Sequence, residues 1–183
     1  MTVQSLEIPE VKLIQLKKFG DNRGFFVETY SKRVLQEAGV DVDFVQDNHS
    51  MSATVGTVRG LHYQLAPHAQ GKLIRVLKGA ILDVAVDIRK GSKTFGQSVS
   101  TILSADNVMM MWVPVGFAHG FETLEPNTEV AYKVTSYYAP THERGIRWND
   151  PSIGVQWRAS EESAVLSAKD KIAPLLKDAT DLF

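Results

Sequence analysis

The stretch of this sequence with the clearest chemical potential is RGLHYQLAPHAQGK, residues 59–72. It holds His62, then His68 six residues later, and Lys72 four residues beyond that. Two histidines this close together indicate either ligands for a metal ion or a base with a lysine beside it. A neutral imidazole takes up a proton near neutral pH, and an ammonium stabilises negative charge that develops on an oxygen. The second arrangement suits removal of a proton next to a carbonyl group.

The flanks of this stretch resemble the two conserved motifs of the cupin superfamily. Residues 56–79 resemble the first motif, G-x5-H-x-H-x3,4-E-x6-G, and residues 114–123 resemble the end of the second, P-x-G-x2-H-x3-N. Cupins bind a metal ion through two histidines and a glutamate of the first motif and the histidine of the second. The resemblance therefore implies that His62 and His119 share one pocket.

Departures from the cupin pattern argue against a metal ion in that pocket. Gln64 stands at the second histidine position, and Lys72 stands where the acidic ligand belongs. An ammonium repels a divalent cation and offers no lone pair until it is deprotonated. We therefore expect a site in which a fixed protein cation replaces the metal, with a metal held by His62 and His119 as the alternative. The remaining departures are Val108 for the leading glycine and Thr123 for the last asparagine.

An ordered set of short motifs gives a narrower resemblance. DNRGFFVE, QDNHS, RGLHYQ, GK, PVGFAHGF and LSAKD occur in this order at residues 21–28, 46–50, 59–64, 71–72, 114–121 and 166–170, with Tyr132 before the last. From about residue 3 to about residue 175 the chain resembles the dTDP-4-dehydrorhamnose 3,5-epimerase family of metal-free cupins. The resemblance implies inversion of dTDP-4-dehydro-6-deoxy-D-glucose at the two carbons flanking its ketone, through enolates and without a cofactor, in dTDP-L-rhamnose biosynthesis.

The same resemblance assigns catalytic roles to four residues. His62 would be the base, with Asp170 fixing its tautomer and ring orientation. Tyr132 would be the acid on the other face of the sugar, and Lys72 would lie near the keto oxygen. Taken alone, Tyr132 is an ordinary strand tyrosine and Asp170 an ordinary member of a charge run, so both assignments depend on the resemblance.

Contacts with the sugar and the nucleotide diphosphate are implied as well. The family is homodimeric, with an N-terminal segment that crosses to the partner, so Arg23 and Phe26 would serve the neighbouring subunit's site. Phe26 and Tyr138 match aromatic positions near the sugar and the thymine. The other matching positions are Glu28, Gln46, Asp47, Asn48, Arg59, His119, Glu143 and Lys169.

The spacing of Arg59 and His62 conflicts with a shared pocket. In a regular strand two residues three apart point to opposite faces of the sheet. A bulge or kink at Gly60 would reconcile them, because glycine in a strand commonly marks such an irregularity. We therefore predict an irregular strand at this point.

The elements that must position these residues are mostly short strands. Runs of apolar and β-branched residues occur at 11–16, 24–30, 44–46, 56–65, 72–76, 81–88, 97–103, 109–113, 119–123 and 129–134, separated by Gly, Pro, Asn and Asp. Such spacing favours an all-β fold of the cupin jelly-roll type, a sandwich or barrel. A short helix is expected at 31–38, and the segment from about 160 to 183 should be partly helical. We expect one domain over residues 1–183.

Composition excludes several classes of function. The net charge of −1 argues against nucleic acid as the main partner, and the absence of cysteine excludes disulfides and thiolate metal sites. The N-terminus does not resemble a signal peptide, and no apolar run approaches the roughly 20 residues of a membrane helix. A cytoplasmic enzyme with no membrane partner is expected.

Three alternatives stay open at this point. A sister enzyme that inverts only one of the two carbons would keep almost the same residues. A metal-dependent cupin oxygenase or isomerase would need a transition metal on His62 and His119. A module that only binds a nucleotide sugar would leave His62, Tyr132 and Asp170 without a chemical task.

Overall fold

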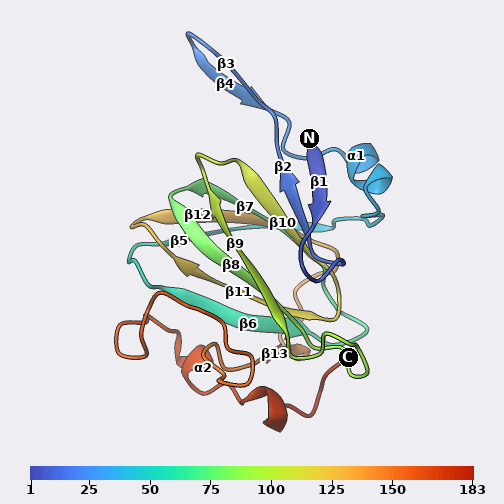
Figure 1. The fold of residues 1–183 in the computed structure, drawn as a ribbon, viewed down its shortest axis with the longest axis vertical. Coiled ribbons are helices and arrows are strands. Elements are labelled where there is room, and N and C mark those ends of the chain that lie inside the picture. The colour runs from blue at the N-terminus through green and yellow to red at the C-terminus, as the bar shows by residue number, and fades with distance from the viewer.

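The computed structural model describes residues 1–183 as a sandwich of two antiparallel sheets with a separate hairpin (Figure 1). The six-stranded sheet has the order β1 (Thr2–Ser5), β2 (Lys12–Gln15), β10 (Met109–Val113), β7 (Lys72–Lys78), β12 (Thr128–Val134) and β5 (Gln46–Ser52). The five-stranded sheet has the order β13 (Glu143–Gly145), β6 (Val58–Gln64), β11 (Phe117–Thr123), β8 (Ala80–Asp87) and β9 (Ser98–Ser104). The prediction of a jelly-roll fold is confirmed.

The remaining elements lie outside the sandwich. Strands β3 (Lys18–Asp21) and β4 (Gly24–Val27) form a hairpin that projects away from the two sheets (Figure 1). Helix α1 (Lys32–Glu37) follows it, and the C-terminal segment contributes only α2 (Ala168–Lys171) and the 3-10 helix η1 (Leu176–Asp178). None of these helices has the length and hydropathy needed to span a bilayer.

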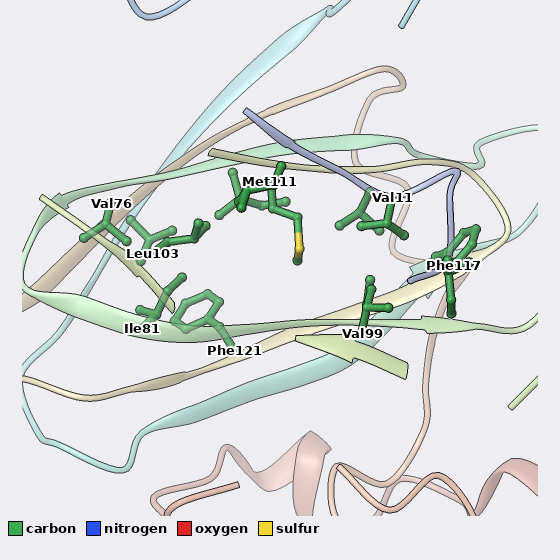
Figure 2. Packing of buried hydrophobic residues seen from close by; sticks show 14 residues of the cluster. Val11, Val76, Ile81, Val99, Leu103, Met111, Phe117 and Phe121 are labelled. Atoms are coloured by element: carbon green, nitrogen blue, oxygen red, sulfur yellow. The ribbon is translucent and has the colours of Figure 1, made fainter. Parts of the chain in front are cut away.

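The main core lies between the two sheets (Figure 2). Met111 from the six-stranded sheet packs there with Ile81, Val99 and Phe121 from the five-stranded sheet, and all four are nearly inaccessible to solvent. Alternation along β8 puts Ile81, Asp83 and Ala85 on this inner face. The interior at this level therefore contains a carboxylate among apolar side chains.

The five-stranded sheet is also covered on its outer face. Val84 and Val86 of β8 pack there with Ile153 and with Leu176 of the C-terminal segment. A strand buried on both faces reads as a nearly continuous apolar run, which explains the sequence AILDVAVD of β8. The same packing holds the C-terminal segment beneath β6 (Figure 1).

Several boundaries differ from the predicted ones. The predicted run at 44–46 overlaps β5 only at Gln46, and β5 continues through mostly polar residues to Ser52. Strands β1, β3 and β13 were not predicted. Strand β5 alternates half-buried and exposed positions and has few apolar side chains, so hydrophobic burial contributes little to its pairing with β12. The C-terminal segment is mostly turns, with less helix than predicted.

Candidate active site

A cavity of about 680 Å³ is lined by residues of both sheets and of the C-terminal segment. His62 of β6 and His119 of β11 reach it from the five-stranded sheet, and Lys72 of β7 and Tyr132 of β12 reach it from the six-stranded sheet. Residues 165–170 form one wall. Segments far apart in the sequence thus converge on one space.

His62 is paired with a carboxylate behind it. Its Nε2 lies 2.5 Å from Oδ1 of Asp170, which is 4% exposed. The hydroxyl of Ser167 donates to Oδ2 of Asp170 at 2.8 Å and accepts from its backbone N–H, so it caps α2 and fixes the carboxylate at once. Burial raises the pKa of Asp170, but the hydrogen bonds from His62 and Ser167 outweigh it, and the net pKa lies below its ordinary value.

The state of Asp170 determines which ring nitrogen of His62 is free. An ionised carboxylate only accepts hydrogen bonds, so Nε2 carries the hydrogen and Nδ1 is left with its lone pair. The imidazole side chain is 23% exposed, through the cavity. His62 therefore has the tautomer and the access that a general base needs.

A bulge in β6 lets Arg59 and His62 share the cavity, as predicted. His119 lies opposite His62 and Phe121 lies opposite Arg59, so two residues of β6 face the single residue Gly120 between them. Gly60 has φ +124°, and a Cβ there would stand 2.6 Å from the Cα of Gly120. Only glycine fits this close approach of two backbones.

Lys72 supplies the cation of the site. Its Nζ donates one hydrogen bond, to the backbone oxygen of His62 at 3.4 Å, and makes no ion pair. Burial lowers the pKa of Lys72 to about 8, with Glu143 and Asp83 acting in the opposite direction. The side chain is therefore an ammonium at neutral pH that is available to a developing oxyanion.

Tyr132 faces the cavity from the opposite sheet. It lies between Ile74 of β7 and Asn48 of β5 in the register of the six-stranded sheet. Burial raises the pKa of Tyr132, while Arg59 lowers it in part, so the phenol keeps its proton at neutral pH. An acid on one sheet and a base on the other suit proton transfer on opposite faces of a flat intermediate.

A second cavity of about 370 Å³ adjoins the first and shares His62, Lys72 and Tyr132 with it. Its far end is lined by Gln46, Asn48, Tyr138 and Glu143. The ring of Tyr138 is exposed, as a platform for stacking must be, and its hydroxyl donates to Glu143 at 3.0 Å. The hydrogen bond to Glu143 raises the pKa of Tyr138.

Glu143 also ties this end of the cavity to the C-terminal segment. Lys169 lies 2.8 Å from the same carboxylate oxygen that Tyr138 contacts. Burial raises the pKa of Glu143, but the hydrogen bonds from Lys169 and Tyr138 outweigh it, and the carboxyl stays ionised. The two cavities together form an elongated site with a reactive end and a polar, aromatic end.

The residues at the cupin ligand positions are engaged with the protein. Gln64 donates to the backbone oxygens of His68 and Tyr137 and accepts from the N–H of Ala139, so its amide joins two loops. His62 is paired with Asp170 and His119 with Asp83 through their Nε2 atoms. No three His, Cys, Asp or Glu side chains are grouped to hold a metal ion. The donor set does not fit the metal of other cupins.

Comparison with known proteins agrees with this geometry. The sequence profile of the dTDP-4-dehydrorhamnose 3,5-epimerase family matches residues 5–178. This chain belongs to the dTDP-4-dehydrorhamnose 3,5-epimerase family. The predicted family and the predicted enzyme class are therefore confirmed.

Three members of the family illustrate the likeness. An epimerase of this name from Sinorhizobium fredii is 53% identical over 96% of this chain and 90% of its own. The crystal structure of the Bacillus anthracis enzyme, with TDP and PPi bound, is 52% identical over 95% of this chain and 98% of its own, with a TM-score of 0.91. The Legionella pneumophila epimerase in complex with dTDP-4-keto-L-rhamnose is 46% identical over 96% of this chain and 93% of its own, with a TM-score of 0.92.

Four residues that the family resemblance assigned to the substrate lie away from both cavities. Arg23 and Phe26 are on the exposed β3–β4 hairpin, where Arg23 pairs with Asp21, and Glu28 is exposed just after it. Asp47 points to the outer face of the six-stranded sheet and pairs with Lys133 at 2.9 Å. A single chain therefore brings none of these four residues to either cavity, and their substrate roles stay predictions.

Three polar residues of the site were missed by the sequence analysis. Ser50 lines the larger cavity, Ser167 holds Asp170, and Asp83 holds His119. A signal existed for two of them. Serine three residues before an acidic residue is typical of a helix N-cap, and alternation along β8 makes Asp83 a buried carboxylate that needs a partner. No pattern in the sequence singles out Ser50.

Proposed function

We propose that this chain converts dTDP-4-dehydro-6-deoxy-D-glucose into dTDP-4-dehydro-L-rhamnose by inverting both carbons beside the ketone. The observation that carries the proposal is the placement of a histidine–aspartate pair and a protonated tyrosine on opposite sheets of one cavity, with a lysine beside them. The product bound to the Legionella relative supports the choice of substrate.

Each inversion proceeds through an enolate. Nδ1 of His62 takes a proton from the carbon next to the ketone. The electrons of the broken C–H bond stay with the sugar and place negative charge on the keto oxygen. The ammonium of Lys72 stabilises the resulting oxyanion, and Asp170 stabilises the imidazolium. Tyr132 then donates its phenolic proton to the other face of the carbon, and solvent restores the protons of both side chains.

The polar end of the site suits the nucleotide. A thymine ring stacks well on an exposed aromatic face such as Tyr138, with Glu143, Gln46 and Asn48 as hydrogen-bonding groups around it. Arg59 and Lys169 line the larger cavity and can neutralise a diphosphate. His119 completes the pocket beside the sugar.

The hairpin suggests how the remaining predicted residues take part. Phe19, Phe25 and Phe26 are each more than half exposed on β3 and β4, an unfavourable arrangement for a lone chain in water. A homodimer in which this N-terminal segment crosses to the partner would cover them and bring Arg23 and Phe26 to the partner's cavity. The single domain and the cytoplasmic location stay predictions.

Incubation with the dTDP-keto sugar in D₂O tests the function. We expect deuterium to enter both carbons flanking the ketone, and proton NMR to show the L-rhamno configuration. Deuterium at one carbon only would favour a single-site epimerase. Absence of any exchange would indicate a module that only binds the nucleotide sugar, and activity that depends on an added transition metal would indicate a metal-dependent cupin.

A further inference from the structure

His119 and Asp83 form a second histidine–aspartate pair beside the first. His119 lies directly opposite His62 on the neighbouring strand, and its Nε2 is 2.7 Å from Oδ1 of Asp83. The Asp83 side chain is 0% exposed and does not line the cavity, whereas His119 does. Asp83 therefore cannot contact a bound ligand directly and acts on it only through other side chains.

The other oxygen of this carboxylate has no partner. Oδ2 of Asp83 is buried and receives no hydrogen bond. Buried polar atoms are nearly always paired, so an exception requires an explanation. Lys72 lines the same cavity as His119, and its single hydrogen bond leaves two N–H groups of the ammonium without an acceptor in the protein.

We propose that Asp83 is a positioning residue of this site, which fixes the tautomer of His119 and keeps a negative charge behind the Lys72 ammonium. The proposal rests on the proposed function and adds a residue to it. Since a carboxylate only accepts, Nε2 of His119 carries the hydrogen and Nδ1 faces the cavity as an acceptor. His119 then accepts from a sugar hydroxyl or from Lys72, and does not donate to an anionic oxygen.

The electrostatics agree with this assignment. Burial lowers the pKa of His119, and the charges of Lys72 and His62 lower it further, against the opposing effect of Asp83. His119 is therefore neutral at pH 7, and the negative charge of Asp83 is left to act on Lys72, whose pKa it raises. The charged and titratable groups that line the two cavities with Lys72 come from several elements. They are Arg59, His62 and Tyr63 of β6, His119 of β11, Tyr132 of β12, Tyr138, Glu143 of β13, and Lys169 and Asp170 of α2. Asp83 of β8 acts on Lys72 without lining either cavity.

Asp83→Asn removes the negative charge of the side chain and keeps its size and shape. Its amide oxygen can still accept from His119, but the negative charge is gone. We expect the alkaline limb of kcat/KM to move to lower pH, with a small loss at pH 6 and a loss that grows towards pH 8; each unit of displacement is about tenfold in the fraction of charged lysine. A profile that superimposes on the wild-type one, or an equal loss at every pH, would overturn the proposal.

Asp87→Asn is the matched control. Asp87 is on the same strand and is also 0% exposed, but its carboxylate is bound by Arg89, Ser92 and Thr94. We expect this variant to lose thermal stability and to keep the wild-type alkaline limb. A limb that moves equally in both variants would show that general loosening of β8, and not the charge of Asp83, is responsible.

Two NMR measurements on the ligand-free protein separate this proposal from the proposed function and from misfolding of a variant. The ¹⁵N spectrum of the wild-type imidazoles should show His119 neutral with its hydrogen on Nε2 at pH 7; the opposite tautomer or a doubly protonated ring would refute the assignment. The Lys72 Nζ resonance should titrate at lower pH in Asp83→Asn than in the wild type. Neither result depends on turnover, so an inactive wild-type protein would count against the proposed function alone.

Discussion

The two histidine–aspartate pairs of this protein have the same contact and different surroundings. Both join Nε2 of the histidine to Oδ1 of the aspartate, at 2.5 Å for His62 and Asp170 and at 2.7 Å for His119 and Asp83. The His62 side chain is 23% exposed through the cavity, whereas that of His119 is 8% exposed. If His62 is the base and His119 only positions the ligand, as we propose, then the two histidines differ in burial and not in the contact with their aspartates.

The two aspartates are also held differently. Asp170 comes from α2, 108 residues from His62, and Ser167 occupies its second oxygen. Asp83 comes from the strand next to that of His119, and its second oxygen is unpartnered. Both oxygens of Asp170 are therefore hydrogen-bonded, whereas one oxygen of Asp83 is not. We propose that the negative charge of Asp83 acts on Lys72.

Asp170→Asn should give the largest effect and break the first pair selectively. Because the Ser167 hydroxyl donates to Oδ2 of Asp170, the oxygen of the new amide would face Ser167 and its NH₂ group would donate to Nε2 of His62. This places the ring hydrogen on Nδ1 and removes the base, whereas Asp83 has no such donor and its amide can keep an oxygen towards His119. We expect kcat to fall by about 10³-fold, within the range for loss of general-base catalysis. Steady-state kinetics at pH 7 measure this, and a fall no larger than that of Asp83→Asn would contradict the distinction between the pairs.

Tyr132→Phe tests whether the acid lies on the other sheet. Proton removal by His62 should continue, so deuterium should still enter a carbon from the base side, while inverted product should form about 10²-fold more slowly for lack of the acid. Proton NMR in D₂O separates exchange from inversion. Product formation at the wild-type rate would exclude Tyr132 as the acid.

Lys72→Arg should cause the smallest loss of activity, and it tests which group sets the alkaline decline of kcat/KM. Lys72 is charged below its pKa of about 8 and neutral above it, so wild-type kcat/KM should decline as the pH rises through about 8. Arginine stays charged throughout this range, so the variant should show no decline of kcat/KM near pH 8. It should be several-fold less active at pH 7, because a planar guanidinium does not reproduce the geometry of the lysine ammonium. An unchanged alkaline limb would mean that another group titrates there.

The sequence indicated that His62 and His119 share one cavity, because local motifs surround both residues. The motif of residues 56–79, which begins and ends with glycine, identifies the strand of His62. Arg59 and His62 would point to opposite faces of a regular strand, and this conflict correctly predicted the bulge at Gly60. Asp170 was found only by resemblance, because its approach to His62 depends on how the C-terminal segment packs against the five-stranded sheet. Such long-range packing has no local signal.

Other features were missed for the same physical reason. Strand β5 has an alternating polar pattern, and its register with β12, which brings Asn48 opposite Tyr132, is set by the partner strand. The sequence alone does not show that Asp83 is buried, because this depends on the burial of both faces of β8. The substrate roles predicted for residues of the β3–β4 hairpin stay predictions, because in one chain the hairpin projects away from both cavities.

The central claim is that His62 removes hydrogen from both carbons beside the ketone. Incubating wild-type protein and His62→Ala with the dTDP-keto sugar in D₂O, and following both positions by NMR, tests it most directly. We expect the wild type to incorporate deuterium at both carbons, and the variant to incorporate none above the rate without enzyme while keeping its fold by circular dichroism. Exchange in the variant at the wild-type rate would contradict the account.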